Sequence, residues 1–399
     1  MAKTIIPIGP FHPLQEEPEF FQLIVEGEKV VDAIANVGYN HRGIEKISEL
    51  KTFDQVTFNI ERICGICSTS HPIAYVRAVE DIIGKDCVVP ERALYIRTII
   101  AELERIHSHL LWLGLAGHFL GYNTVYMWVW KQREEILDIC EELTGNRNHY
   151  AMIKVGGVRR DFEKSTFPGI ITRLNKLTKF MEMIKGAVLD DPVLHARLKG
   201  IGILTKQNCI DYCALGPVSR ASGIPNDVRR DAPYAVYDRI KWNVITQEEG
   251  DVFAKTVVRI LEIFESINMI IQCFNKMPGG PIDANVKDVP PGEGIGHIEA
   301  PRGETFHYVR SDGTNRPIRH KVRAPTFMNL PTFKEALIGG TISDATIILA
   351  AIDPCYCCTE RVTVIDANNN KNKTVYSQQD LIKLSQQKTE EIRNKLGVK

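Results

Sequence analysis

The sequence predicts an α+β fold that is predominantly helical, in which a central bundle of long helices lies between β-rich N-terminal and C-terminal regions. Two patterns predict it. Apolar residues recur at helical spacing through the middle of the chain, and short strand-like runs with turn residues occupy both flanks. With 399 residues, 44% of them hydrophobic, the chain can bury a large core. We expect a single large domain over residues 1–361 and a tail over residues 362–399.

The N-terminal part, residues 1–60, is expected to be β-rich. The runs 21–25 and 29–34 are rich in branched and aromatic residues and flank Gly27, a pattern typical of a hairpin. Residues 61–275 are expected to form the helical core. Pro90 suits the first turn of a helix, and the long apolar-periodic stretch 91–112 follows it. Further helices are predicted over residues 133–143, 169–187 and 249–275.

The stretch 106–130 contains no Asp, Glu, Lys or Arg and is long enough to span a bilayer. It also contains three histidines and three glycines, and its flanks lack the pattern that anchors a membrane helix. A helix that is apolar on all sides can instead be the central helix of a large soluble domain. We favour this second interpretation.

The segment 277–291 is rich in proline and glycine and begins a second β-rich part, residues 276–361. The runs 305–309 and 319–322 are predicted strands, and the segment Gly292 to Gly296 is interpreted as a loop because it lacks the G-x-G-x-x-G spacing of a dinucleotide site. A short helix near 332–339 and an apolar run over 346–352 are expected next. In the tail, we predict a hairpin from residues 362–365 and 374–376 and a helix over 378–396 with Ser377 as its N-cap.

The charge balance gives no reason to expect nucleic acid or an anionic membrane surface as a partner, because Lys plus Arg equals Asp plus Glu at 49 each. The first residues lack the features of a secretory signal, so we expect a cytoplasmic location and reduced thiols. The ten cysteines are then better explained as ligands and core residues than as disulfides.

Two C-x-x-C pairs near opposite ends of the chain, Cys64 with Cys67 and Cys355 with Cys358, point to a metal. Thiolates are soft ligands, and the two sulfurs of such a pair can reach one ion without distorting the backbone. A structural zinc site and redox or incidental cysteines are the alternatives. The long separation of the pairs favours a metal buried in a large core, where one sulfur of each pair could be shared with a second metal.

The flanks of both pairs carry a family resemblance. Arg62-Ile63-Cys64-Gly65-Ile66-Cys67 with His71, together with Asp353-Pro354-Cys355-Tyr356-Cys357-Cys358, resemble the two signature motifs of the nickel–iron hydrogenase large subunit. The rest of residues 5–361 resembles the membrane-bound, energy-converting branch (group 4), which is related to the 49-kDa-type subunit of respiratory complex I. The implied activity is reversible cleavage of dihydrogen, coupled through partner subunits to ion translocation across a membrane.

The resemblance also implies the roles of individual residues. Cys64 and Cys355 would be terminal nickel ligands. Cys67 and Cys358 would bridge nickel to an iron that carries carbonyl and cyanide ligands, and His71 would donate a hydrogen bond to a bridging sulfur.

Further site residues follow from the same resemblance. Arg302 would lie over the open side of the metals as a catalytic residue, and Pro325 and Thr326 would line the pocket of the iron's diatomic ligands. Glu17 would carry protons away; its alternative is a surface carboxylate in a charged run. Glu45 would organise a second site that holds magnesium or iron.

The implied partners are a small hydrogenase subunit with a 4Fe–4S cluster, integral membrane subunits and a ferredoxin-type carrier. This chain shows no iron–sulfur spacing of its own, so electrons must leave through such a partner. The subunit would be peripheral on the cytoplasmic face of the cell membrane. Many hydrogenase large subunits lose an extension beyond the position of Arg361 by proteolysis, and here we favour retention of the tail for docking.

Two other functions stay open. One is a metal-free quinone-site subunit like that of complex I; against it, complex I relatives lack the four cysteines and carry a histidine-containing loop where this chain has residues 15–18. The other is a zinc-stabilised scaffold without enzymatic activity. The metal content of the purified protein separates all three.

Overall fold

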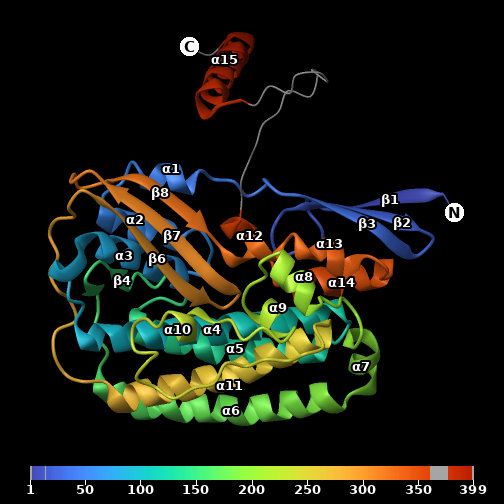
Figure 1. Ribbon diagram of the computed structural model, residues 1–399, viewed down its shortest axis with the longest axis horizontal. Helices are drawn as coiled ribbons and strands as arrows, with labels where there is room; N and C mark the ends of the chain where they lie inside the picture. The colour runs from blue at the N-terminus through green and yellow to red at the C-terminus, as the bar shows by residue number, and fades with distance from the viewer. Residues whose placement is uncertain (1, 14, 360–375, 398–399) are drawn as a thin grey trace.

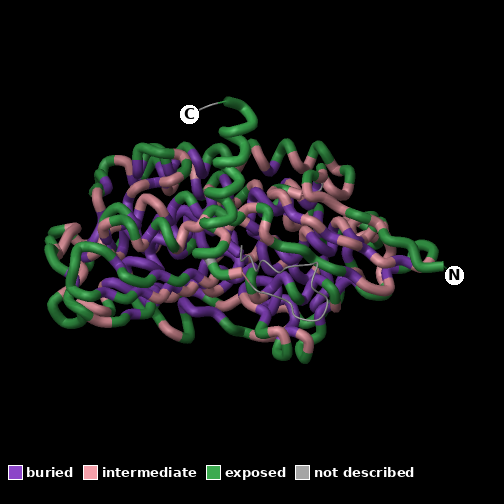
Figure 2. The backbone as a smooth tube through the Cα atoms, turned by 90° about the horizontal axis from the view of Figure 1, so that it is seen from above, coloured by how far each residue is buried: buried purple, intermediate pink, exposed green. Residues whose placement is uncertain are grey.

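The computed structural model describes residues 2–13, 15–359 and 376–397, and Figure 1 shows a layer of long helices beneath two antiparallel sheets. The predicted fold class is confirmed. The long helices are α4 (Glu91–Phe119), α5 (Asn123–Thr144), α6 (Phe167–Asp190) and α11 (Val252–Lys276). Buried residues run through the whole interior in Figure 2, and α4 is buried along nearly its full length. The core therefore surrounds α4.

The apolar stretch 106–130 is divided between two helices. Residues 106–119 belong to the buried helix α4, as the core-helix interpretation expects, but the remaining residues do not continue it. Helix α4 ends at Phe119, and Gly121 takes a left-handed backbone conformation with φ of 85°. Helix α5 then starts at Asn123, and its Trp128 is 50% exposed. Among the described residues, no helix has both the length and the apolar character needed to cross a membrane.

The first sheet has strand order β1-β2-β3 and is antiparallel throughout. Its strands are β1 (Lys3–Ile8), β2 (Phe20–Glu26) and β3 (Lys29–Asn36), and the predicted hairpin is β2–β3. In β2, Phe21, Leu23 and Val25 alternate toward the core, as expected for a sheet with one buried face. The rest of the N-terminal part is helical, with α1 (Ile44–Ser48) and α2 (Phe53–Glu61).

The second sheet has order β6-β7-β8, with β6 (Gly292–Ala300), β7 (Gly303–Ser311) and β8 (Pro317–Arg323). The two predicted strands are confirmed, but the predicted loop over 292–296 is wrong, because it begins β6. The backbone of helix α3 (Ser70–Ile83) lies directly against this strand. A Cβ added at Gly294 would lie 2.0 Å from the carbonyl oxygen of Ala78, so glycine here permits close helix–strand packing.

This close approach predicts a large cost for Gly296→Ala. The added Cβ would lie 1.9 Å from the carbonyl oxygen of Ala74, and backbone cannot move aside without shifting α3. We expect the free energy of unfolding to fall by about 3 kcal/mol or more, at the upper end for overpacking. The control is Gly186→Ala in α6, where nothing lies within 4 Å and a gain of about 0.5–1 kcal/mol is expected. Denaturant titration of both variants measures the difference.

The C-terminal part of the body is helical around the second cysteine pair. It contains α12 (Pro325–Asn329), α13 (Thr332–Leu337), α14 (Ile342–Ala351) and the single turn η3 (Tyr356–Cys358). The predicted helix near 332–339 is confirmed as α13, which lies beside β3 of the N-terminal sheet. The N-terminal sheet and the C-terminal helices of the body therefore lie side by side.

The tail contains helix α15 (Gln378–Leu396), whose Leu381 lines a cavity together with Arg42 and Cys357 of the body. The Ser377 hydroxyl caps it by accepting the Asp380 N–H at 3.3 Å, as predicted. The predicted hairpin falls outside the described residues, apart from Tyr376. The shorter elements are η1 (Gly84–Asp86), β4 (Ile153–Lys154), β5 (Gly157–Val158), η2 (Lys164–Thr166), α7 (Pro192–Leu198), α8 (Lys206–Asp211), α9 (Pro217–Arg220) and α10 (Val228–Asp231).

Candidate metal centre

The two cysteine pairs meet in one buried cage. The Sγ atoms of Cys64, Cys67, Cys355 and Cys358 all lie within 4.8 Å of one another, and all four residues are buried. The first pair lies in the loop between α2 and α3, and the second follows α14. Within the described ranges, no other group of three or more His, Cys, Asp or Glu residues is close enough to share an ion.

The pKa values of the four thiols indicate that they do not all ionise unless a metal ion is bound. Hydrogen bonds from the other three thiols lower the pKa of Cys64, whereas burial raises the pKa of Cys358 well above its usual value. Four thiolates this close together repel one another strongly, and a bound metal ion would offset that repulsion. A bound metal ion removes the remaining protons, since the thiolate is the ligand form of cysteine. The donor set therefore fits a soft transition metal.

Arg302 is buried directly beside the cage. Its Nη1 lies 3.7 Å from Cys67 Sγ and 3.1 Å from Ser108 Oγ, and its Nη2 lies 2.6 Å from Asp353 Oδ1. Burial by itself would lower the pKa of Arg302, but Asp353 and the cysteine sulfurs more than offset it and hold this pKa well above its usual value. A permanent positive charge thus faces the thiolates.

Thr326 and Pro325 lie at the start of α12, next to the second pair. The Thr326 hydroxyl accepts the backbone N–H of Cys355 at 3.0 Å, and both residues are buried. Pro325 takes the first helical position, where its missing N–H costs nothing. Thr326 therefore helps to hold Cys355 in place, and the predicted pocket role of Thr326 and Pro325 stays a prediction.

Glu17 joins the cage to a solvent-facing cavity. Its Oε2 accepts the backbone N–H of Cys357 at 2.7 Å, and burial raises the pKa of its carboxyl. It also lines a cavity of about 390 Å³. The other lining residues are Pro10, Phe11, His12, Pro13, Gln15, Glu16 and Pro18. Glu17 is therefore half-buried and bound to the second cysteine motif, and its role in carrying protons stays a prediction.

His71 contacts the cage from α3. Its Nε2 lies 3.3 Å from Cys358 Sγ, as the motif resemblance implies, and burial lowers its pKa to about 4. The start of α3 is held by Glu104 of α4, which accepts the N–H and hydroxyl of Ser70 and the N–H of Thr69. Burial raises the pKa of Glu104 to about 8. Sequence reasoning missed this anchor, although an acidic residue in a long apolar helix is the signal for it.

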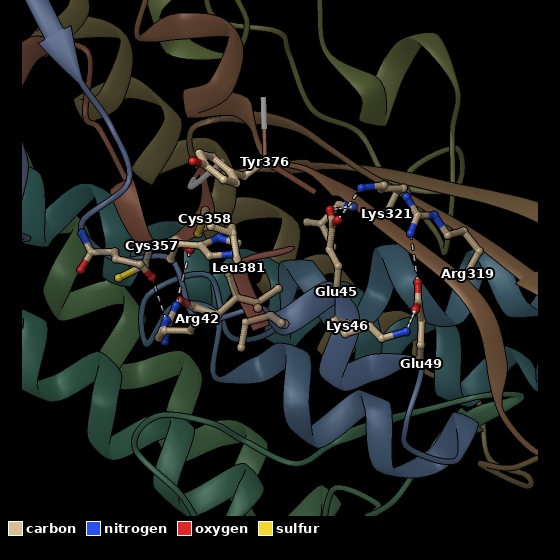
Figure 3. Close-up of a pocket in the computed structure, with 16 residues that line it drawn as sticks. Arg42, Glu45, Lys46, Glu49, Arg319, Lys321, Cys357, Cys358, Tyr376 and Leu381 are labelled. Atoms are coloured by element: carbon tan, nitrogen blue, oxygen red, sulfur yellow. Dashed lines mark hydrogen bonds and ion pairs between the residues drawn. The ribbon is translucent and has the colours of Figure 1, made fainter. Parts of the chain in front are cut away.

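Glu45 lies further out, on the wall of a second cavity of about 470 Å³ that also reaches Cys357 and Cys358. In Figure 3 the Lys321 side chain points to Glu45, at 2.7 Å between Nζ and Oε2, and the Val322 N–H donates to Oε1 at 3.0 Å. A cation of the chain itself thus occupies one side of this carboxylate. A second metal at Glu45 stays a prediction.

Arg42, which sequence reasoning also missed, connects the two ligand loops. Its guanidinium donates to the carbonyl oxygens of Arg62 at 2.9 Å and Ile63 at 2.6 Å, and lies 3.5 Å from that of Cys357 (Figure 3). These carbonyls belong to residues adjacent to the cage. The planar guanidinium can span them at once, which a lysine cannot do.

We expect Arg42→Ala to loosen the cage. Two hydrogen bonds from a charged donor are worth about 1–2 kcal/mol at this exposed position, so metal loss into a chelator should accelerate about tenfold. Arg319→Ala is the matched control, because Arg319 lines the same cavity but pairs with Glu49, a surface contact of little value. Equal rates of metal release from the two variants would show that Arg42 does not stabilise the cage by connecting the two ligand loops.

Comparison with known proteins places this geometry in a family. The family described as respiratory-chain NADH dehydrogenase, 49 Kd subunit, matches residues 120–289 and 284–361, and the nickel-dependent hydrogenase family matches residues 42–117. The chain is 41% identical to the membrane-bound hydrogenase subunit alpha of Pyrococcus furiosus, covering 97% of this chain and 93% of that protein. The chain belongs to the hydrogenase large-subunit family that is related to the 49-kDa subunit of complex I.

Other members of this family support the same placement. The carbon monoxide-induced hydrogenase of Rhodospirillum rubrum is 41% identical over 90% of this chain and 100% of its own length. A chain in the structure of the membrane-bound sulfane sulfur reductase, an archaeal respiratory membrane complex, superposes with a TM-score of 0.85 at 31% identity, covering 90% of this chain and 98% of that one. The protein is therefore an oxidoreductase of the hydrogenase type, and its relatives are subunits of membrane-bound complexes.

Proposed function

We propose that this chain is the catalytic subunit of an energy-converting nickel–iron hydrogenase, which splits and forms dihydrogen at the four-cysteine cage. The observation that carries the proposal is the meeting of both cysteine pairs in one buried site beneath Arg302. The fold alone does not decide the activity, because the sulfane sulfur reductase chain shares it. The four sulfur donors support the proposal, since they favour a soft transition metal.

The residues of the cage suit a nickel–iron group. Cys64 and Cys355 would be terminal ligands of nickel, and Cys67 and Cys358 would be ligands that nickel shares with iron. When bound, this group supplies the open metal position at which dihydrogen is polarised. Carbonyl and cyanide ligands on the iron would lie against Pro325 and Thr326. A structural zinc site would need neither a buried guanidinium nor a carboxylate at its edge.

Two side chains around the cage, Arg302 and Glu17, would direct the proton that dihydrogen releases. The fixed charge of Arg302 disfavours a proton on the nearby sulfur of Cys67. The Glu17 carboxyl accepts the Cys357 N–H through Oε2 and also contacts the Cys357 side chain, next to the second cysteine pair. Because burial raises its pKa, the protonated form is populated closer to neutral pH than for a free carboxyl. Glu17 would then release the proton into the cavity behind it.

Electrons need a separate exit. We propose that they pass to a small subunit with a 4Fe–4S cluster and onward to a ferredoxin-type carrier. Integral membrane subunits would hold the complex at the cytoplasmic face of the membrane and couple the reaction to ion translocation. The names of the relatives, which include a membrane-bound hydrogenase subunit, support this assembly.

Metal analysis and infrared spectroscopy of the purified native complex test the proposed function. We expect nickel and iron in equal amounts and infrared bands of carbonyl and cyanide. Absence of nickel together with absence of these bands would remove the proposal. Zinc at one equivalent, without dihydrogen activity, would instead support the scaffold.

A further inference from the structure

Three buried histidines form a continuous line that starts at the cage. His71 Nε2 lies 3.3 Å from Cys358 Sγ, and His71 Nδ1 lies 3.1 Å from His307 Nε2. His307 Nδ1 in turn lies 2.9 Å from His320 Nε2. All three rings are at most 1% exposed. The line therefore runs from a ligand sulfur into the β6-β7-β8 sheet.

The sheet explains why the rings meet. His307 on β7 pairs in register with Val322, and His320 on β8 pairs with Val309, so the two histidines are diagonal neighbours on the same face. Helix α3 lies against that face because of the glycines in β6, and it brings His71 to within hydrogen-bonding distance of His307. The ring of Tyr75 packs edge-on against His307 and His320.

The rings are neutral. Each ring is buried and makes its printed hydrogen-bond contacts with a sulfur or another imidazole rather than with a carboxylate, so a charge on it would be unpaired. A neutral imidazole carries one N–H donor and one acceptor nitrogen. Fixing the proton on one ring of the line therefore fixes it on the next.

The Cys358 sulfur determines in which direction the three histidines donate their hydrogen bonds. A ligand sulfur is a thiolate and can only accept, so His71 must carry its proton on Nε2. Its Nδ1 then accepts from His307 Nε2, and His307 Nδ1 accepts from His320 Nε2. The last nitrogen, His320 Nδ1, becomes a bare acceptor, and in the described part of the chain it has no hydrogen-bond partner. All three N–H groups then point toward the sulfur.

We propose that His307 and His320 are positioning residues that act through His71 to hold an N–H on the sulfur of Cys358. Aligned hydrogen bonds strengthen one another by roughly 10–30% each, so the two outer rings increase the donor strength of His71. A stronger donor withdraws electron density from the sulfur and tunes the metal that it binds. The purpose of the line rests on the proposed function, but its existence does not.

Cobalt(II) bound to the full-length chain tests the line without nickel or iron. Its sulfur-to-cobalt charge-transfer band reports the electron density on the thiolates. The affinity of the chain for cobalt reports how well the surrounding residues position the cysteine ligands. In His307→Leu, we expect the band to move to lower energy and the affinity to fall about tenfold, as for other outer residues of metal sites. His307→Gln keeps one donor and one acceptor and should retain the band and affinity of the natural protein.

Tyr75→Phe is the matched control, because it keeps the ring against both histidines and removes only a hydroxyl that donates to the Phe53 carbonyl. An unchanged band and affinity in His307→Leu would overturn the proposal. Equal losses in His307→Leu and His307→Gln would also overturn it, because they would show that the position matters for packing alone. If His307→Leu does not fold, the pair His320→Leu and His320→Gln is measured in the same way and decides between the same outcomes. Failure of the nickel and infrared test leaves this readout intact, so the two proposals fail separately.

Discussion

Cys358→Ser should yield a folded chain that carries no nickel–iron group. A serine hydroxyl is a hard donor that stays protonated at neutral pH, so it replaces a soft thiolate poorly. The change also removes the sulfur that His71 contacts and one corner of a cage whose four sulfurs lie within 4.8 Å. We expect nickel and iron to fall at least tenfold in the purified complex, with loss of the carbonyl and cyanide bands.

Cys357→Ser is the control for this result. Cys357 is the adjacent cysteine, but it is outside the group of four sulfurs, and its backbone N–H binds Glu17. This variant should keep both metals. Metals lost from Cys357→Ser but kept in Cys358→Ser would show that the second pair uses another register than the one proposed.

Glu17→Gln should keep both metals and lose proton exchange. Glutamine can still accept the Cys357 N–H through its amide oxygen, so the loop stays in place, but it cannot take up or release a proton. Loss of a positioned acid–base group costs about 10²–10⁴-fold in rate. The measurement is exchange between deuterium gas and water by mass spectrometry, which needs no electron acceptor and so isolates the proton step.

The comparison variant is Glu16→Gln, which removes the neighbouring carboxyl that lines the same cavity and whose pKa burial raises to about 8. Exchange should persist in this variant. Exchange that persists in Glu17→Gln and disappears in Glu16→Gln would transfer the role to Glu16. Exchange that persists in both would show that protons leave by another route.

The cysteine cage was predictable because its ligands lie in two compact motifs whose spacing is set by backbone geometry. The contacts around it were not. Arg42 acts through carbonyl oxygens, which leave no trace in a side-chain pattern, and His307 and His320 become neighbours only through the register of β7 and β8. Single-sequence reasoning sees periodicity along the chain, whereas these contacts depend on which strands pair.

The fold differs from the prediction in two places. The stretch 106–130 is uniformly apolar, so its hydrophobic pattern does not reveal the turn at Gly121 that ends α4. The segment from Gly292 to Gly296 has the composition of a loop, yet it forms a strand because α3 must approach its backbone closely. At Gly121 a glycine with positive φ ends the helix locally, whereas at Gly292 to Gly296 tertiary packing overrode the local preference. The long periodic helices, where local and tertiary demands agree, were predicted correctly.

X-ray absorption at the nickel edge of the purified native complex tests the central claim most directly. If the two ends of the chain close around one metal cage, nickel must be coordinated by four sulfur atoms with an iron neighbour beyond them. Replacing either Cys64 or Cys355 by serine should then remove the nickel signal. Nickel bound by two sulfurs or fewer, or a complex that contains zinc in place of nickel, would contradict this account.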